Sequence, residues 1–229
     1  MLESALRNTE ELESDSAEYD GYDEKKLRLA ALLHDVGHPP FSHALEKSVF
    51  PKHEDYSSAL IEGPLATLIE KAELNPKEIS GLVQGRSDPK KSYLTKILSS
   101  QLDADRMDYL TRDSHYTGVL YGVFDLERLV LSIAIKKGQL VVLRKGLFAA
   151  DQFLLSRFYM YEQVYLHTVK RAFEGMARLF AENDGKGLQY PSEKDLGSKK
   201  QLSSFLSSDD EWFTSLLRRE SRTDTGREE

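Results

Sequence analysis

The chain of 229 residues has 31 basic and 38 acidic side chains, a formal net charge of −7 and no cysteine. The acidic balance argues against a nucleic-acid partner, because nucleic-acid-binding proteins carry a basic surface. The lack of cysteine excludes disulfides and thiolate metal sites, so any metal ion must be held by histidine and carboxylate side chains. No apolar run is long enough to span a bilayer and no signal peptide opens the chain, so we expect no membrane partner and a cytoplasmic location.

Helical patterns dominate the first half of the sequence. We expect a helix over residues 1–12, an exposed acidic loop over 13–24, and a helix over 25–36 that is apolar nearly all round and therefore buried. This helix is ended by a glycine and two prolines: Gly37, Pro39 and Pro40. Ser42 is the expected N-cap of a short helix over 42–50. Further helices are expected at 54–62, 64–72, 76–82 and 91–113, with a loop at 85–90.

The second half predicts one small β element among helices. A helix over 124–133 precedes an alternating stretch over 134–143, which turns at a Lys-Gly pair and predicts a β-hairpin. A long helical stretch over 147–183 follows, interrupted only at Gly175. The expected C-terminal elements are a linker at 185–192, helices at 193–206 and 209–219, and a disordered tail at 221–229.

Four of the six histidines lie within twenty residues of sequence: His34, His38, His43 and His53. His34 and Asp35 end an otherwise apolar helix, where a buried carboxylate is costly unless its charge is compensated. A divalent metal ion provides that compensation, with imidazole and carboxylate as ligands. The rigid Gly-Pro turn that follows directs His38 and His43 back toward the same cleft.

Two further groups of polar residues recur at helical spacing. Asp105, Tyr109 and Asp113 fall at positions i, i+4 and i+8 of a predicted helix, on one face, with Arg106 beside them. A carboxylate that can bind metal next to a cation and a phenol suits a phosphate-and-sugar site. The same spacing recurs on the long helix at Arg157, Tyr161 and Tyr165.

Each group also has a purely structural interpretation. An isolated His-Asp pair is more often an ordinary hydrogen-bonded pair, although four neighbouring histidines favour the metal interpretation here. The Asp105 group taken alone is more often a solvated charged face. The Arg157 group is more often core packing, because aromatic stripes at helical spacing usually pack in a core.

Taken together, these motifs resemble HD-domain phosphohydrolases, most closely the branch that contains the deoxynucleoside triphosphate triphosphohydrolases. The resemblance holds from about residue 27 to 177, and three strings carry it: His34-Asp35-Val36-Gly37-His38-Pro39-Pro40-Phe41-Ser42-His43, Asp103-Ala104-Asp105-Arg106-Met107-Asp108-Tyr109, and Tyr161-Glu162-Gln163-Val164-Tyr165-Leu166-His167. It implies a mainly α fold, a helical HD-domain bundle with a small β-hairpin. The HD domain is expected over 1–183, followed by a linker and C-terminal helical segment over 184–229.

The resemblance also implies roles for individual residues. The expected metal ligands are His34, Asp35 and Asp105, for a divalent ion that could be Mn, Fe, Ni, Zn or Mg. The expected catalytic residues are His38, His43 and His53, with Glu46 as the orienting carboxylate. The expected contacts to the phosphates and sugar of a nucleotide are Arg106, Tyr109, Asp113, Arg157, Tyr161 and Tyr165.

The resulting function hypothesis is hydrolysis of a deoxynucleoside triphosphate to nucleoside and triphosphate, with a nucleotide as the small-molecule partner and a homo-oligomer as a possible assembly. No histidine precedes His34, whereas the family has a metal-ligand histidine there. We therefore expect sequence to be missing at the N-terminus and the metal site to be incomplete. Two alternatives stay open: a catalytically impaired HD domain that binds a nucleotide or protein, and another HD-type phosphodiesterase.

Overall fold

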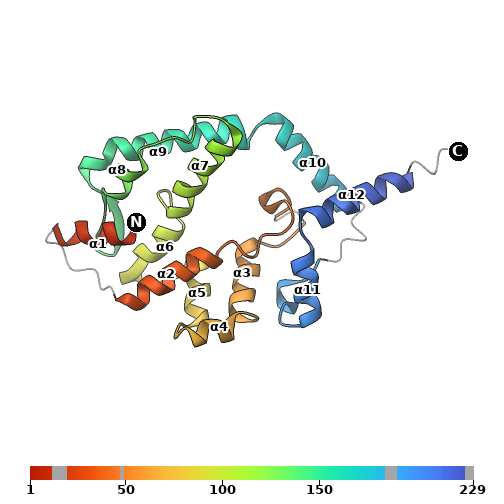
Figure 1. The fold of residues 1–229 in the computed structure, drawn as a ribbon, viewed down its shortest axis with the longest axis horizontal. Helices are drawn as coiled ribbons and strands as arrows, with labels where there is room; N and C mark the ends of the chain where they lie inside the picture. The colour runs from red at the N-terminus through yellow and green to blue at the C-terminus, as the bar shows by residue number, and fades with distance from the viewer. Residues whose placement is uncertain (12–19, 47–48, 184–189, 225–229) are drawn as a thin grey trace. The chain divides into compact units, whose positions relative to one another are not determined.

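The computed structural model of the chain describes residues 1–11, 20–46, 49–183 and 190–224. Helices make up most of this part, and one two-stranded antiparallel sheet accompanies them (Figure 1). The predicted fold class, mainly α with a small β-hairpin, is confirmed. No helix within these ranges is long and apolar enough to cross a membrane.

The chain folds into two compact units, each formed from two separate segments of sequence. The first unit comprises Met1–Leu32 and Glu78–Lys170, and the second comprises Leu33–Lys77 and Arg171–Glu229. The domain boundary predicted after residue 183 falls beside a segment that lies outside the described residues, so it stays a prediction.

The first unit contains the sheet and most of the helices. Its elements, including nearly all of α2 and α5, are α1 (Leu2–Glu11), α2 (Gly21–Leu33), α5 (Pro76–Val83), η2 (Pro89–Lys91), α6 (Ser92–Leu98), α7 (Ala104–Thr117), α8 (Leu126–Val130), β1 (Ile133–Lys136), β2 (Gln139–Val142), η3 (Arg144–Gly146), α9 (Leu147–Met160) and η4, a π-helical turn (Tyr161–Tyr165).

The predicted β-hairpin is present and also anchors α1. Lys137 and Gly138 between the strands both have positive φ, 50° and 72°, as a type I′ hairpin turn requires. The side chain of Asn8 donates hydrogen bonds to the carbonyl oxygens of Leu131 and Ile133. α1 is thereby attached to the start of β1 by side-chain hydrogen bonds as well as by packing.

The second unit is a set of helices around an aromatic core. Its elements, including most of α10, are η1 (Ser42–Ala44), α3 (His53–Glu62), α4 (Ala66–Lys71), α10 (Thr168–Asn183), η6 (Glu193–Asp195), α11 (Lys199–Ser207) and α12 (Asp210–Asp224). Two clusters of buried side chains hold it together: Leu45, Phe50, Ala181 and Phe213 in one, and Tyr56, Leu60, Leu196 and Phe205 in the other. The Tyr56 hydroxyl donates a hydrogen bond to the Pro191 carbonyl, which ties α3 to the C-terminal segment.

The helix predicted at 25–36 differs from the structure at both ends. It begins at Gly21 because the Asp20 carboxylate accepts a hydrogen bond from the Asp23 N–H and caps it. It ends at Leu33, so His34 and Asp35 lie in the turn after the helix and not on its last turn. The expected burial on all sides is also wrong, since Leu32 is 73% exposed.

Three other boundaries were predicted wrongly. Ser42 is no N-cap: Phe41 precedes η1, which ends at Ala44, and residues 47–48 of the expected helix lie outside the described residues. The helix expected at 91–113 is broken, because the Asp103 side chain accepts the Arg106 N–H and starts α7 anew. The long C-terminal helix breaks at its π-helical turn and not at Gly175, which lies inside α10.

The remaining elements occur close to their predicted places. Helices are present at 53–62, 66–71 and 76–83, shorter ones than expected at 126–130 and 199–207, and a longer one than expected at 210–224. The tail was expected to be disordered from residue 221, but α12 continues to Asp224. The linker expected at 185–192 lies largely outside the described residues.

Candidate functional site

The predicted metal-binding motif forms a turn that is bound to α3. After α2 ends, the His38 N–H donates to the Asp35 carbonyl, 3.2 Å away, which closes the turn. The buried hydroxyl of Ser57 accepts a hydrogen bond from the Gly37 N–H at 3.0 Å and donates one to the His34 carbonyl at 2.6 Å. Two backbone groups of the turn are therefore satisfied by one side chain of α3.

Gly37 is required at this position by close packing. A Cβ atom there would lie 2.3 Å from the His53 carbonyl oxygen and 2.4 Å from the Ser57 nitrogen, both in the backbone of α3. The backbone of a helix cannot move aside as a flexible side chain can. Any residue larger than glycine at this position would therefore push the turn away from α3. The glycine thus allows the His-Asp turn to lie directly against the helix that carries His53.

Three imidazoles converge on one oxygen of Asp35. The distances to its Oδ1 are 3.4 Å from Nε2 of His34, 3.4 Å from Nε2 of His38 and 3.6 Å from Nε2 of His53. Burial by itself raises the pKa of the Asp35 carboxyl, but the hydrogen bond from His38 and the charges of the three imidazoles outweigh it, so the pKa is lowered. Asp35 is therefore held as a carboxylate among nitrogen ligands.

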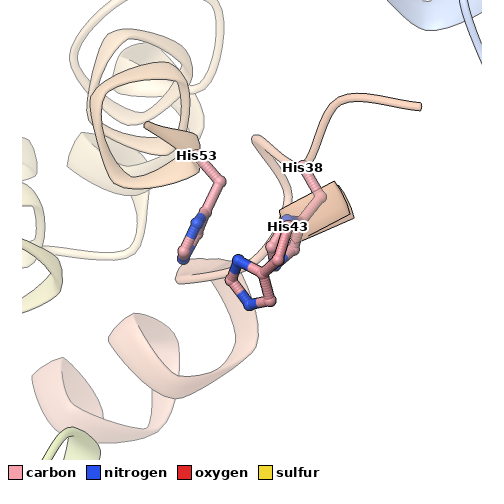
Figure 2. A group of neighbouring side chains, drawn as sticks. All are labelled: His38, His43 and His53. Atoms are coloured by element: carbon pink, nitrogen blue, oxygen red, sulfur yellow. The ribbon is translucent and has the colours of Figure 1, made fainter. Parts of the chain in front are cut away.

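The rings of His38, His43 and His53 face one another, although they come from three segments of chain (Figure 2). His38 is stacked on His53, with ring centroids 4.0 Å apart and planes at 19°. His43 meets both edge-on, at 4.8 Å from His38 and 5.2 Å from His53. The sequence predicted that these histidines share a cleft, and in the structure their rings are in contact.

Glu46 holds two of these rings with one carboxylate. Its Oε2 lies 2.7 Å from Nδ1 of His43, its Oε1 lies 2.7 Å from Nδ1 of His53, and Oε1 also accepts the backbone N–H of His53 at 2.8 Å. Burial raises the pKa of the Glu46 carboxyl, but these hydrogen bonds prevail and bring the pKa to about 2.

An ionised carboxylate only accepts hydrogen bonds, so His43 and His53 must both carry a hydrogen on Nδ1. In the neutral form of each ring, Nε2 then has the free lone pair that can bind a metal ion or accept a proton. The position of Glu46 thus determines the tautomer of two histidines at once.

The turn continues through two residues in the left-handed region. Phe41 has φ 56° and Ser42 has φ 46°, which is unfavourable for residues with a side chain. The Phe41 N–H donates to Oδ1 of Asp210 at 2.7 Å, and its ring packs edge-on against Phe213 with centroids 5.5 Å apart. The first and fourth residues of α12 therefore hold the segment between His38 and His43.

The residues expected to contact a nucleotide lie in the first unit, on α7, α9 and η4. The Tyr165 hydroxyl donates to Oδ2 of Asp113 at 2.6 Å. The Arg157 guanidinium lies over the Tyr161 ring, 5.5 Å from its centroid, and Tyr165 is edge-on to both Tyr109 and Tyr161. These five side chains form one polar and aromatic cluster, which supplies cationic and phenolic groups together.

Arg106 belongs to a separate arrangement at the start of α7. Its guanidinium bonds to the Asp103 carboxylate and to the Ser100 carbonyl, and Asp103 is fully buried as the α7 N-cap. Burial raises the pKa of the Asp103 carboxyl despite these contacts. A cavity of about 470 Å³ adjoins this group, and its lining residues include Lys96 and Arg106 but no carboxylate. An anion suits such a lining.

The residues of the turn have the spacing that metal ligands need. Two ligands about 2.1 Å from a tetrahedral ion lie about 3.4 Å apart, and Nε2 of His34 and Oδ1 of Asp35 are 3.4 Å apart. Nδ1 of His38 is buried and has no hydrogen-bond partner among the described residues. Asp105, the third predicted ligand, lies in the first turn of α7 in the first unit, and its place in the metal site stays a prediction.

Comparison with known proteins identifies the class to which this turn belongs. The model of the HD domain matches residues 6–113, and the model of the HD-associated region matches residues 124–225. The chain therefore belongs to the HD-domain proteins and carries the associated region as well. This confirms the family that the sequence motifs resemble.

The relatives similar in sequence include an uncharacterised protein and one named as a triphosphohydrolase homologue. The chain is 37% identical over 177 residues to an uncharacterised protein, YwfO, of Bacillus subtilis. The aligned region covers 76% of this chain and 40% of YwfO. It is 33% identical over 176 residues to a Dictyostelium discoideum protein named as a homologue of the deoxynucleoside triphosphate triphosphohydrolase SAMHD1, covering 71% of this chain and 34% of that one.

Solved structures agree with this assignment. A phosphohydrolase from Bacteroides thetaiotaomicron matches 92% of this chain and 55% of its own with a TM-score of 0.70 and 28% identity. A hypothetical protein from Aquifex aeolicus matches 85% of this chain and 52% of its own, with a TM-score of 0.68 and 33% identity. The chain spans about half the length of these structures and less of the sequence relatives above. It belongs to the HD-domain phosphohydrolase family.

Several residues that shape the site were not predicted from the sequence. Ser57 and Asp210 hold the turn, and Asp103 positions Arg106, yet none of them stood out as a candidate. Asp103 preceding an acidic first helical turn was a detectable N-cap signal. Ser57 and Asp210 lie 20 and 169 residues from their partners, and no local pattern indicates such contacts.

Proposed function

We propose that this chain carries the catalytic unit of a metal-dependent phosphohydrolase that converts a deoxynucleoside triphosphate and water into the deoxynucleoside and inorganic triphosphate. Family membership supports a phosphohydrolase, and the named activity of the Dictyostelium relative supports this substrate class. We further propose a cytoplasmic enzyme with a nucleotide as its small-molecule partner. A homo-oligomer remains part of this proposal.

The convergence of three imidazoles on Asp35 is the observation that carries the proposal. Such a group of nitrogen and carboxylate ligands without cysteine suits a divalent ion such as Mn, Fe, Ni, Zn or Mg. A structural hydrogen-bonded pair needs one histidine beside the carboxylate, whereas three surround Asp35, two from the turn and His53 from α3. The two additional histidines are explained if they act on a metal ion or on a substrate.

The proposed roles follow the geometry of each group. His34, Asp35 and Asp105 would hold the ion, which when bound polarises a phosphoryl oxygen and lowers the pKa of water. Glu46 fixes the tautomers of His43 and His53, so that a neutral Nε2 of either ring can accept a proton from water. The His43 side chain is 69% exposed, so it is the better placed of the two to reach a substrate oxygen.

The nucleotide would be bound by residues of the first unit. Arg106 and Arg157 provide cations for the phosphates. The proposed contacts to the sugar are the phenols and the carboxylate of the aromatic cluster: Tyr109, Asp113, Tyr161 and Tyr165. The pairing of Tyr165 with Asp113 leaves the second carboxylate oxygen available to accept a sugar hydroxyl.

Two alternatives are compatible with the same fold. The first is a catalytically impaired HD domain that binds a nucleotide or protein without turnover. The HD fold also serves other phosphodiesterases, and the structural relatives are named only as a phosphohydrolase and a hypothetical protein. The products of an assay separate these three functions.

The test is an assay of purified protein with each of the five metals against the four deoxynucleoside triphosphates, the four ribonucleotides and a phosphodiester. The proposal predicts inorganic triphosphate and deoxynucleoside in equal amounts. In water enriched in ¹⁸O the label should enter triphosphate, because water attacks phosphorus and the leaving oxygen stays with the sugar. Release of phosphate or pyrophosphate would contradict the proposal. Nucleotide binding without product would indicate the catalytically impaired HD domain. Turnover of the phosphodiester alone would indicate another HD-type phosphodiesterase. The Asp35→Asn variant is the control for contaminating activity.

A further inference from the structure

We propose that Ser57 is a positioning residue for the His-Asp turn: its hydroxyl sets Asp35 and His38 relative to His53. The inference rests on the function proposed above, because it assigns a role within that site. Ser57 makes its hydrogen bonds to backbone atoms of the turn, including the carbonyl of His34, and not to the side-chain atoms proposed to bind the ion. It acts through the backbone of the turn.

The hydrogen bonds of Ser57 use both capacities of its hydroxyl. It accepts the Gly37 N–H at 3.0 Å and donates its own hydrogen to the His34 carbonyl at 2.6 Å. The bonded groups flank Asp35 on both sides in sequence, one residue before it and two residues after it. Ser57 is fully buried, so water does not replace these bonds when the hydroxyl is removed.

The position of Ser57 on α3 connects the turn to His53. The two residues are four apart on a helix and therefore lie on the same face. The turn rests on this face so closely that a Cβ at Gly37 would lie 2.3 Å from the His53 carbonyl oxygen. A shift of the turn along α3 would therefore change the stacking of His38 on His53, now at 4.0 Å, and the separation of Asp35 from His53, now at 3.6 Å.

The next residue provides a matched control. Ser58 lies on the same helix and is 6% exposed, so its burial is nearly that of Ser57. Its hydroxyl has no hydrogen-bond partner within the described parts of the chain. Ser58→Ala therefore removes the same atom from the same helix without releasing the turn.

The experiment compares Ser57→Ala, Ser58→Ala and the unaltered chain after circular dichroism has established that all three are folded. Isothermal titration with Mn²⁺ should show an affinity about 10- to 100-fold lower for Ser57→Ala and an unchanged affinity for Ser58→Ala, as loss of a group that orients metal ligands predicts. The turnover number should fall by a similar factor in Ser57→Ala alone, with the KM for nucleotide within about twofold, because the proposed nucleotide contacts lie elsewhere.

A measurement without metal or substrate keeps the inference separate from the proposed function. The imidazole resonances of His38 and His53 in metal-free protein should shift in Ser57→Ala and stay in place in Ser58→Ala. Unshifted resonances in both variants, or equal effects of both on every readout, overturn the role of Ser57. If instead the unaltered chain neither binds metal nor hydrolyses nucleotides while the resonances shift as expected, the proposed function fails and the positioning role of Ser57 stands.

Discussion

The backbone N–H of Phe41 donates a hydrogen bond to the carboxylate of Asp210 across 169 residues of sequence. Asp210 belongs to the segment matched by the HD-associated region, and Phe41 belongs to the segment matched by the HD domain. The two matched regions are therefore joined at the loop between His38 and His43. This contact gives the associated region a direct influence on the position of catalytic candidates.

The Asp210→Ala variant should lose this hydrogen bond. We expect a cost of about 1 kcal/mol in the free energy of unfolding and a turnover number several-fold lower, because the loop that carries His43 becomes less constrained. Asp210→Asn keeps an acceptor oxygen and should behave nearly as the unaltered chain. Urea unfolding and steady-state kinetics measure the two effects.

Asp209 supplies the control for helix stability. Its side chain accepts the Trp212 N–H at 2.9 Å and caps α12, so Asp209→Ala should also cost about 1 kcal/mol. It does not bond to the turn, so its turnover number should stay unchanged. If Asp209→Ala and Asp210→Ala reduced turnover equally, the effect would come from α12 as a whole and not from the Phe41 contact.

The Glu46→Gln variant should lower the turnover number about 100-fold or more. A glutamine amide offers one acceptor and one donor group, so it can no longer accept from Nδ1 of both His43 and His53. One of the two rings must then change its tautomer or lose its bond. Nitrogen-15 NMR of the imidazoles detects this change, and Glu62→Gln, at the exposed end of α3, is the control that should leave both rings and turnover as they are.

The lowered pKa of Glu46 also predicts how the free energy of unfolding depends on pH. Its pKa is about 2 in the folded chain against an ordinary 4.5, so folding favours the ionised form. The resulting stabilisation is fully present above pH 4.5 and is lost as the pH falls from 4.5 toward 2. The facing titratable groups are His43, His53 and Glu54, and the hydrogen bonds from the two histidines favour the carboxylate.

Urea unfolding at several pH values between 6 and 2.5 checks this prediction. The unaltered chain should lose free energy of unfolding more steeply below pH 4.5 than Glu46→Gln, which has no carboxyl at this position. Parallel curves for the two proteins would mean that Glu46 does not have a lowered pKa.

Tyr165→Phe should weaken nucleotide binding and leave the chemical step nearly unchanged. Burial and the neighbouring Asp113 carboxylate raise the pKa of the Tyr165 phenol, which therefore stays protonated as a donor. Without it Asp113 loses a partner, and we expect the KM for nucleotide to rise about 5- to 10-fold with the turnover number within about twofold. Tyr159→Phe removes the same atom from a more exposed tyrosine of α9 and should not change KM; an equal rise there would contradict the prediction.

The sequence was sufficient to predict the elements whose structure is determined by short-range patterns. The Lys137-Gly138 turn and the flanking alternation predicted the hairpin, since both turn residues need positive φ. It was insufficient where one side chain overrides a helical pattern. Apolar and polar residues alternate with helical periodicity over 91–113. The Asp103 side chain nevertheless accepts hydrogen bonds from two backbone N–H groups and separates α6 from α7.

The same limit applies to the site. Four histidines close together in sequence indicated a shared cleft, and three of their rings are in contact because the turn after Asp35 packs against α3. The support of that turn was not predictable, because two adjacent serines on α3 look alike in the sequence. Only the packing of Gly37 against the helix determines that Ser57 is bonded and Ser58 is not.

The left-handed pair Phe41 and Ser42 has an evolutionary consequence. Each such residue costs about 1–2 kcal/mol relative to glycine, so a glycine at Ser42, whose side chain has no ring contact such as that of Phe41 with Phe213, would relieve backbone strain. It would also let the loop between His38 and His43 adopt other conformations, since glycine has no Cβ to restrict it. Under selection for thermal stability alone, lineages should drift toward glycine at Ser42, whereas selection for turnover keeps the strained residue. Thermostable and fast variants of this chain should therefore diverge first at this loop.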